Sequence, residues 1–109
     1  MYVLLLWQNN HNKNRNMENL LDKATIVDVR TPEEFEDEHF PGAVNIPLDQ
    51  LQYRLEEFRE MKTPIVAYCR SGSRSGVAVS ILKQRGINEV YNGGGLKDML
   101  RQAKSTRLQ

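Results

Sequence analysis

The sequence has a single cysteine among its 109 residues, so no disulfide can form within the chain. A domain without disulfides needs no oxidising compartment, and we therefore expect a cytoplasmic protein. Sets of cysteines, or of histidines with carboxylates, at the spacing of metal ligands are also missing. We accordingly predict no metal site and no cofactor.

An excess of charge of one sign is missing too, because the net charge is only +1 at pH 7. Surfaces that bind nucleic acid or membranes usually show as a basic excess, so we expect neither kind of partner. The apolar residues 1–7 are too few to cross a bilayer, and no positive charge precedes them as in a signal peptide.

Length and composition indicate one folded unit. The chain has the size of a single domain, and its 39% hydrophobic and 27% charged residues are near globular averages. Residues 8–16 are polar and contain five asparagines without helix or strand periodicity. We therefore predict a disordered or non-native extension over 1–16, a domain over 17–103 and a flexible tail over 104–109, and we expect a monomer.

Within that domain, apolar runs alternate with helical patterns, which is typical of an α/β domain with a mainly parallel sheet. The strands are expected at 26–29, 43–46, 65–68 and 89–91. Helices are expected from the capping Thr31, from Asp49 through a stripe ending at Met61, and over 75–85 and 96–103. The glycines at 93–95 are expected to form a turn.

Cys69 follows the most apolar of these strands, which predicts a place at the centre of the sheet. Ligands of open parallel sheets bind beyond the carboxyl ends of such strands. A six-residue loop begins at Cys69 and runs into the helix expected near Ser75. The lone cysteine therefore lies where a catalytic group is expected.

Three effects should favour a thiolate at Cys69. The first turn of a helix has unpaired amides and a positive dipole end, a tight loop can point further amides inward, and Arg70 and Arg74 add positive charge. Such surroundings lower a cysteine pKa from about 8.5 to roughly 3.5–7.5. A free cysteine is often a small buried hydrophobe instead, but the loop with two arginines favours a nucleophile.

Four segments together resemble the single-domain rhodanese family. They are CRSGSRS at 69–75, IVDVR followed by TPEEF at 26–35, EHFPGAVNIP at 38–47 and YNGGG at 91–95. The match covers roughly 17–103, with the motifs in the family's order. One departure is that Leu96, Lys97 and Asp98 follow the glycines, where the family usually has an Ala-Trp pair.

The resemblance implies a three-layer rhodanese-like fold, with a mainly parallel central sheet of four or five strands flanked by helices. The residues available for a fifth strand are 2–6. It also implies a thiosulfate sulfurtransferase, in which Cys69 takes the sulfane sulfur of thiosulfate or a similar small anionic donor as a persulfide. The acceptor would be cyanide in assays, and a thiol or a protein sulfur acceptor in the cell.

The same resemblance assigns roles to the residues around Cys69. The arginines of the loop would attract and orient the anionic donor, and the loop amides would stabilise the persulfide. Asp28 and Arg30 are expected to be structural residues near the site, and His39 is expected to be structural because the transfer needs no base. The substrate-binding residues are then Arg70, Ser71, Gly72, Ser73, Arg74 and Ser75.

Two alternatives stay open. The domain could be a persulfide relay or interaction module that serves a partner protein. It could also be a phosphatase or arsenate reductase, but related phosphatases have five residues between the cysteine and the arginine. Only four lie between Cys69 and Arg74, and this smaller ring suits one sulfur atom better than a phosphoryl group.

Overall fold

The computed structural model describes residues 20–108, with side chains for residues 20–103. Residues 1–19 and 109 lie outside the described part. The predicted extension over 1–16, the possible strand over 2–6 and the start of the domain at Met17 fall there, so they stay predictions.

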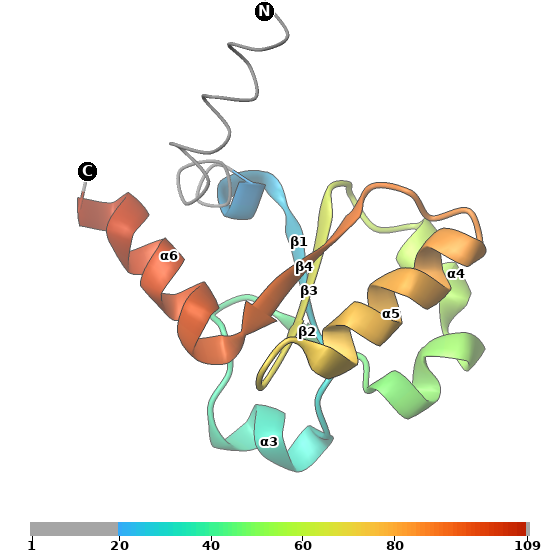
Figure 1. Cartoon of the computed structure of the whole chain (residues 1–109), viewed down its shortest axis with the longest axis horizontal. Coiled ribbons are helices and arrows are strands. Elements are labelled where there is room, and N and C mark those ends of the chain that lie inside the picture. The colour runs from blue at the N-terminus through green and yellow to red at the C-terminus, as the bar shows by residue number, and fades with distance from the viewer. Residues whose placement is uncertain (1–19, 109) are drawn as a thin grey trace, which may run out of the picture.

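The described residues form one sheet of four parallel strands in the order β2-β1-β3-β4 (Figure 1). This confirms the predicted α/β fold. Every residue of β3 is buried, as expected for a strand that is covered on both faces. The strands are β1 (Thr25–Asp28), β2 (Val44–Asn45), β3 (Ile65–Cys69) and β4 (Val90–Gly95).

Alternate residues of the central strands enter two separate cores, because successive side chains of a strand point to opposite faces. Val27 and Ala67 pack with residues of α5 (Ser73–Gln84), η1 (Leu48–Tyr53) and α4 (Leu55–Arg59) on one face. Ile26 and Val66 pack with Met99 of α6 (Leu96–Leu108) on the other. The sheet is therefore the middle of three layers, with Cys69 on the side of α5.

Helix α3 (Pro32–Asp37) begins where the sequence predicts. Thr31 Oγ1 accepts a hydrogen bond from Glu34 N, and the Glu34 carboxylate accepts one from Thr31 N. This capping box supplies partners for two amides that the first turn would leave unpaired. It also holds the Glu34 side chain in one place, at the end of β1.

The helix predicted through Met61 is in fact two helices, which is a correction. The first is the 3-10 helix η1, and Arg54, with φ −123° and ψ 28°, separates it from α4. A 3-10 helix places residues three apart on one face, so Leu48 and Leu51 still reach the core. Helix α6 extends to Leu108, beyond the predicted end at Ala103.

The predicted glycine turn is also wrong, because Gly93, Gly94 and Gly95 belong to β4. Gly95 pairs with Cys69, and a Cβ atom on Gly95 would lie 2.2 Å from Arg70 O. A Cβ on Gly93 would lie 2.5 Å from Met99 Sδ. The glycines thus let β4 approach the Cys69 loop on one side and α6 on the other. Within residues 20–108, no helix is long and apolar enough to cross a membrane.

Candidate active site

Cys69 is the last residue of β3, at the carboxyl edge of the sheet, and the loop 70–72 joins it to α5. Gly72 is the N-cap residue of α5 and has φ +102°, in the left-handed region that favours glycine. Its neighbour across the loop is Gly94, whose Cα would lie 3.3 Å from a Cβ on Gly72. The tight path of the loop around the sulfur therefore depends on Gly72.

The sulfur of Cys69 accepts hydrogen bonds from the loop and from the first turn of α5. The backbone N–H of Gly72 lies 3.0 Å from Sγ, and the N–H of Ser75 lies 3.5 Å away. The Ser75 hydroxyl oxygen is 3.4 Å from Sγ. These three donors favour the ionised sulfur over the thiol.

The pKa of the Cys69 thiol reflects two opposed effects. Burial raises it, whereas the hydrogen bond from the Ser75 hydroxyl and those from the amides of Ser75, Gly72 and Ser71 lower it. The hydrogen bonds outweigh the burial, and the pKa falls below its usual range to about 7. A large share of Cys69 is therefore thiolate, the nucleophilic form, near neutral pH.

The hydrogen bonds to Glu34 raise the pKa of Arg74, and the charge of the Cys69 thiolate helps to raise it, so the guanidinium interacts with the sulfur but also forms an ion pair with Glu34. Arg74 donates two hydrogen bonds to the Glu34 carboxylate, at 2.8 and 3.0 Å. Arg70 is exposed and lines a pocket beside the loop. The capping box holds Glu34 at the end of β1, so the carboxylate is already in place to bind the Arg74 guanidinium.

Cys69 is completely buried, although it lies at the carboxyl end of a central strand, where ligands of open parallel sheets bind. Ser71 and Ser73 are exposed on the outer side of the loop, with their hydroxyl oxygens 3.3 Å apart. Contact between Sγ and another molecule therefore requires movement of the residues that cover the sulfur. The buried position also keeps water away from a charged sulfur, which strengthens each hydrogen bond to it.

Asn92 of β4 is a further residue of the site, to which the sequence analysis assigned no role. Its Oδ1 accepts from the Ser75 hydroxyl at 2.7 Å and from Gly94 N at 2.9 Å. Its Nδ2 donates to Gly72 O at 3.0 Å. Asn92 thus holds both residues that donate to the sulfur. In the sequence, the feature that could have drawn attention to Asn92 is its position directly before three glycines.

A buried polar network supports the neighbouring end of β1. Asp28 accepts hydrogen bonds from Arg30 Nη2 and from the Tyr68 hydroxyl, both at 2.7 Å. The Tyr68 oxygen in turn accepts from Phe40 N at 2.9 Å. Burial raises the pKa of Tyr68, so its hydroxyl stays protonated and donates to Asp28. Asp28 and Arg30 bind each other at the start of the connection between β1 and α3. The hydrogen bonds of this network do not include the Cys69 sulfur.

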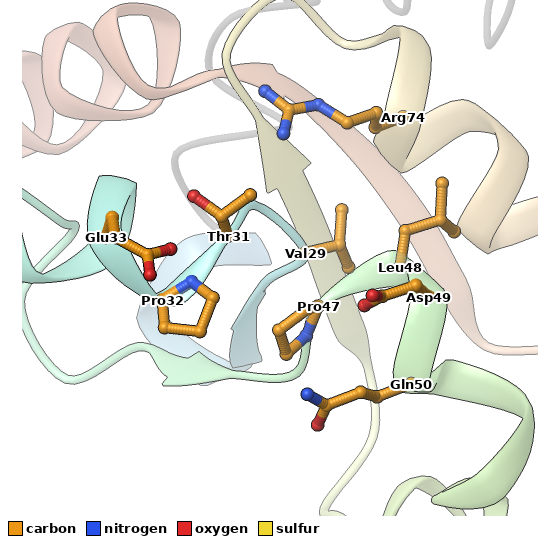
Figure 2. Close-up of a pocket in the computed structure, with 9 residues that line it drawn as sticks. All are labelled: Val29, Thr31, Pro32, Glu33, Pro47, Leu48, Asp49, Gln50 and Arg74. Atoms are coloured by element: carbon orange, nitrogen blue, oxygen red, sulfur yellow. The ribbon is translucent and has the colours of Figure 1, made fainter.

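Each residue of the Glu34–Arg74 pair lines a different pocket. The first has a volume of about 510 Å³, and Figure 2 shows Arg74 extending from α5 toward the side of the pocket formed by Thr31 and Glu33. The second, of about 430 Å³, contains Glu34 and Arg70. The first is lined by Val29, Thr31, Pro32, Glu33, Pro47, Leu48, Asp49, Gln50 and Arg74, and the second by Arg30, Glu34, Asp37, Glu38, Arg70, Leu96 and Lys97.

His39 does not face the sulfur as a base would. Its ring stacks on Phe35, and its Nδ1 lies 2.7 Å from Phe35 O at the end of α3. In the part of the chain that the structure describes, no three His, Cys, Asp or Glu side chains form a group that could hold a metal ion.

Known proteins of similar sequence include two bacterial relatives. The uncharacterized protein YqhL of Bacillus subtilis is 49% identical over 76 residues, which cover 69% of this chain and 60% of YqhL. The thiosulfate sulfurtransferase PspE of Escherichia coli is 43% identical over 74 residues, which cover 67% of this chain and 71% of PspE. This chain thus spans less than two thirds of YqhL and somewhat more of PspE.

A solved structure shares the fold as well as the sequence. The structure described as a rhodanese with anions from E. coli aligns with a TM-score of 0.63 and 39% identity, covering 69% of this chain and 89% of that one. The sequence model of the rhodanese-like domain matches residues 12–101, which is most of the chain and includes the Cys69 loop. The resemblance seen in the motifs is therefore confirmed, and the chain belongs to the rhodanese-like domain family.

Proposed function

We propose that this protein is a sulfurtransferase that carries sulfur on Cys69 as a persulfide. The observation that carries the proposal is the set of three hydrogen bonds that Cys69 Sγ accepts from Gly72 and Ser75. They stabilise a nucleophilic thiolate without a neighbouring base. Family membership and the 43% identity to PspE, a thiosulfate sulfurtransferase, support the same reaction.

With thiosulfate as donor, the thiolate of Cys69 attacks the outer sulfur. The sulfur–sulfur bond of thiosulfate breaks, sulfite leaves with the electron pair, and the persulfide anion of Cys69 remains. Cyanide then attacks the outer sulfur, thiocyanate leaves, and the thiolate is restored. The loop amides stabilise negative charge on sulfur in each of these states.

The persulfide itself is the most direct test. After incubation of the full chain with thiosulfate, intact mass spectrometry should show the addition of one sulfur atom, and thiocyanate should form when cyanide is added. Cys69→Ser should lose both signals, while Ser80→Ala, on an exposed face of α5, should keep them. Ready alkylation of Cys69 without persulfide from thiosulfate or from a small alkyl persulfide would contradict the proposal.

The alternatives give different results in the same experiment. A relay module would load slowly from thiosulfate and rapidly from a cysteine desulfurase, in the cytoplasm where we expect the protein to act. Hydrolysis of an aryl phosphate that Cys69→Ser abolishes, without any persulfide, would indicate a phosphatase. The tight loop, with Gly72 N only 3.0 Å from Sγ, favours sulfur transfer over phosphoryl transfer.

A further inference from the structure

The Glu34 carboxylate binds the Arg74 guanidinium in the protein without substrate. Both terminal nitrogens of Arg74 donate to the two carboxylate oxygens of Glu34, at 2.8 and 3.0 Å. Glu34 also accepts from Thr31 N at 3.0 Å and from Thr31 Oγ1 at 3.2 Å. The carboxylate is therefore held in position from two sides, and an incoming anion must compete with it for Arg74.

The charges around the loop balance one another. The basic groups are Arg30, Arg70, Arg74 and Lys97, and the acidic groups that pair with them or share their pocket are Asp28, Glu34, Asp37 and Glu38. Four positive and four negative charges give no net attraction for a dianion. Glu34 directly neutralises Arg74, which lies in the first turn of α5.

We propose that Glu34 is a specificity-determining residue, which disfavours dianionic donors such as thiosulfate and leaves the site suited to persulfides of uncharged thiols. This inference rests on the proposed sulfurtransferase function and concerns its donor. The Glu34 carboxylate occupies both terminal nitrogens of Arg74, with which Arg74 would otherwise bind two oxygens of thiosulfate. A persulfide of an uncharged thiol has no such oxygens and loses little from the pairing.

The transfer from a persulfide needs no other reactant. The Cys69 thiolate attacks the outer sulfur of the donor R–S–SH, the donor's sulfur–sulfur bond breaks, and R–S⁻ leaves with the electron pair. The proton stays on the transferred sulfur, which becomes Cys69–S–SH, and sulfur undergoes no net oxidation. The product loses that proton to solvent and becomes the persulfide anion that the amides of Gly72 and Ser75 stabilise.

Glu34→Gln is the variant that tests this inference, since glutamine can also complete a capping box and α3 should keep its start. The charge on Glu34 is lost and Arg74 becomes available to an anion. We expect kcat/KM for thiosulfate to rise about tenfold at low ionic strength, as for one recovered charged hydrogen bond. The value for the persulfide of 2-mercaptoethanol should change less than about twofold, because that donor makes no bidentate contact.

Glu36→Gln is the matched control, because it removes the same charge from an exposed position of α3 that lines neither pocket. It should leave the ratio of the two donors unchanged. A second measurement is the salt dependence, which should become steeper for thiosulfate in Glu34→Gln only, because a freed guanidinium attracts the dianion. Thermal unfolding of the variants confirms that each is folded.

Three results would overturn the inference: no gain with thiosulfate in a folded Glu34→Gln, an equal gain with both donors, or the same gain in Glu36→Gln. Each of these leaves sulfur transfer itself intact. The proposed function fails in a different way, through the lack of a Cys69 persulfide with either donor in the unmodified protein.

Discussion

The Ser75 hydroxyl oxygen lies 2.7 Å from Asn92 Oδ1, in hydrogen-bonding contact. The same oxygen lies 3.4 Å from Cys69 Sγ, and a hydroxyl has only one proton to donate. That proton is therefore shared between a strong acceptor on β4 and the sulfur. Ionisation of Cys69 makes the sulfur the stronger acceptor and shifts the proton toward it. The balance between the two acceptors helps to set the reactivity of the thiol.

Removal of the hydroxyl should make the sulfur less acidic. In the unmodified protein, the rate of Cys69 alkylation by iodoacetamide should rise with pH through a midpoint near 7 and level off above it, because only the thiolate reacts. Ser75→Ala loses a donor to the thiolate, so this profile should move to higher pH and the rate at pH 7 should fall roughly three- to tenfold. Ser80→Ala is the control, and an unmoved profile in Ser75→Ala would contradict the assignment.

A carboxylate at position 92 should also make the Cys69 thiol less acidic, because it adds a negative charge near the sulfur. Asn92→Asp keeps an acceptor for the Ser75 hydroxyl but places a negative charge beside it, which disfavours the thiolate, and it also loses the Nδ2 donor to Gly72 O. We expect alkylation and persulfide formation at pH 7 to slow by roughly threefold or more, with recovery at higher pH. Asn88→Asp adds the same charge at an exposed position, and it should leave the pH profile in place.

The buried network at the end of β1 should be essential to stability. Asp28→Ala leaves the guanidinium of Arg30, which is only 6% exposed, without its carboxylate partner. Breaking a buried pair in this way costs about 3–5 kcal/mol in free energy of unfolding, measurable by urea denaturation. Asp37→Ala, on the exposed face of α3, should stay within about 0.5 kcal/mol. Equal effects of the two variants would contradict the role of the network.

Contact between β4 and the loop should be needed for activity. The Cβ of Gly95→Ala would lie 2.2 Å from Arg70 O and 3.0 Å from Arg70 C, so the backbone next to Cys69 has to move. Stability should fall by about 1–3 kcal/mol, and persulfide formation in the folded fraction should fall by roughly tenfold because the sulfur loses its aligned donors.

Gly42→Ala separates this effect from the cost of losing a glycine. Gly42 has φ +83° and open space around its Cβ position, so the substitution strains the backbone by about 1 kcal/mol or more without touching the loop. It should lower the melting temperature and leave the rate of persulfide formation in the folded protein unchanged. A loss of activity equal to that of Gly95→Ala would indicate general destabilisation instead.

Local patterns were enough to predict the fold class and the catalytic candidate. Strand periodicity, the Thr31 cap and the position of Cys69 after an apolar run depend on neighbours within a few residues, which the sequence displays directly. The division of the predicted 49–61 helix and the inclusion of the glycines in β4 were missed, because packing against the sheet decided both. In each case, the local propensities allowed more than one backbone path.

Contacts between distant segments decided how the site is arranged. Arg74 reads in the sequence as a cation for the sulfur, yet it binds Glu34, forty positions earlier in the chain. Asn92 holds Ser75 because the parallel β3–β4 pairing brings the two together. Sequence by itself determined which residue is the candidate nucleophile and which elements surround it. Only the tertiary structure decided which charges and donors the sulfur meets, because charged and polar side chains pair with whichever partner the folded backbone brings within hydrogen-bonding distance.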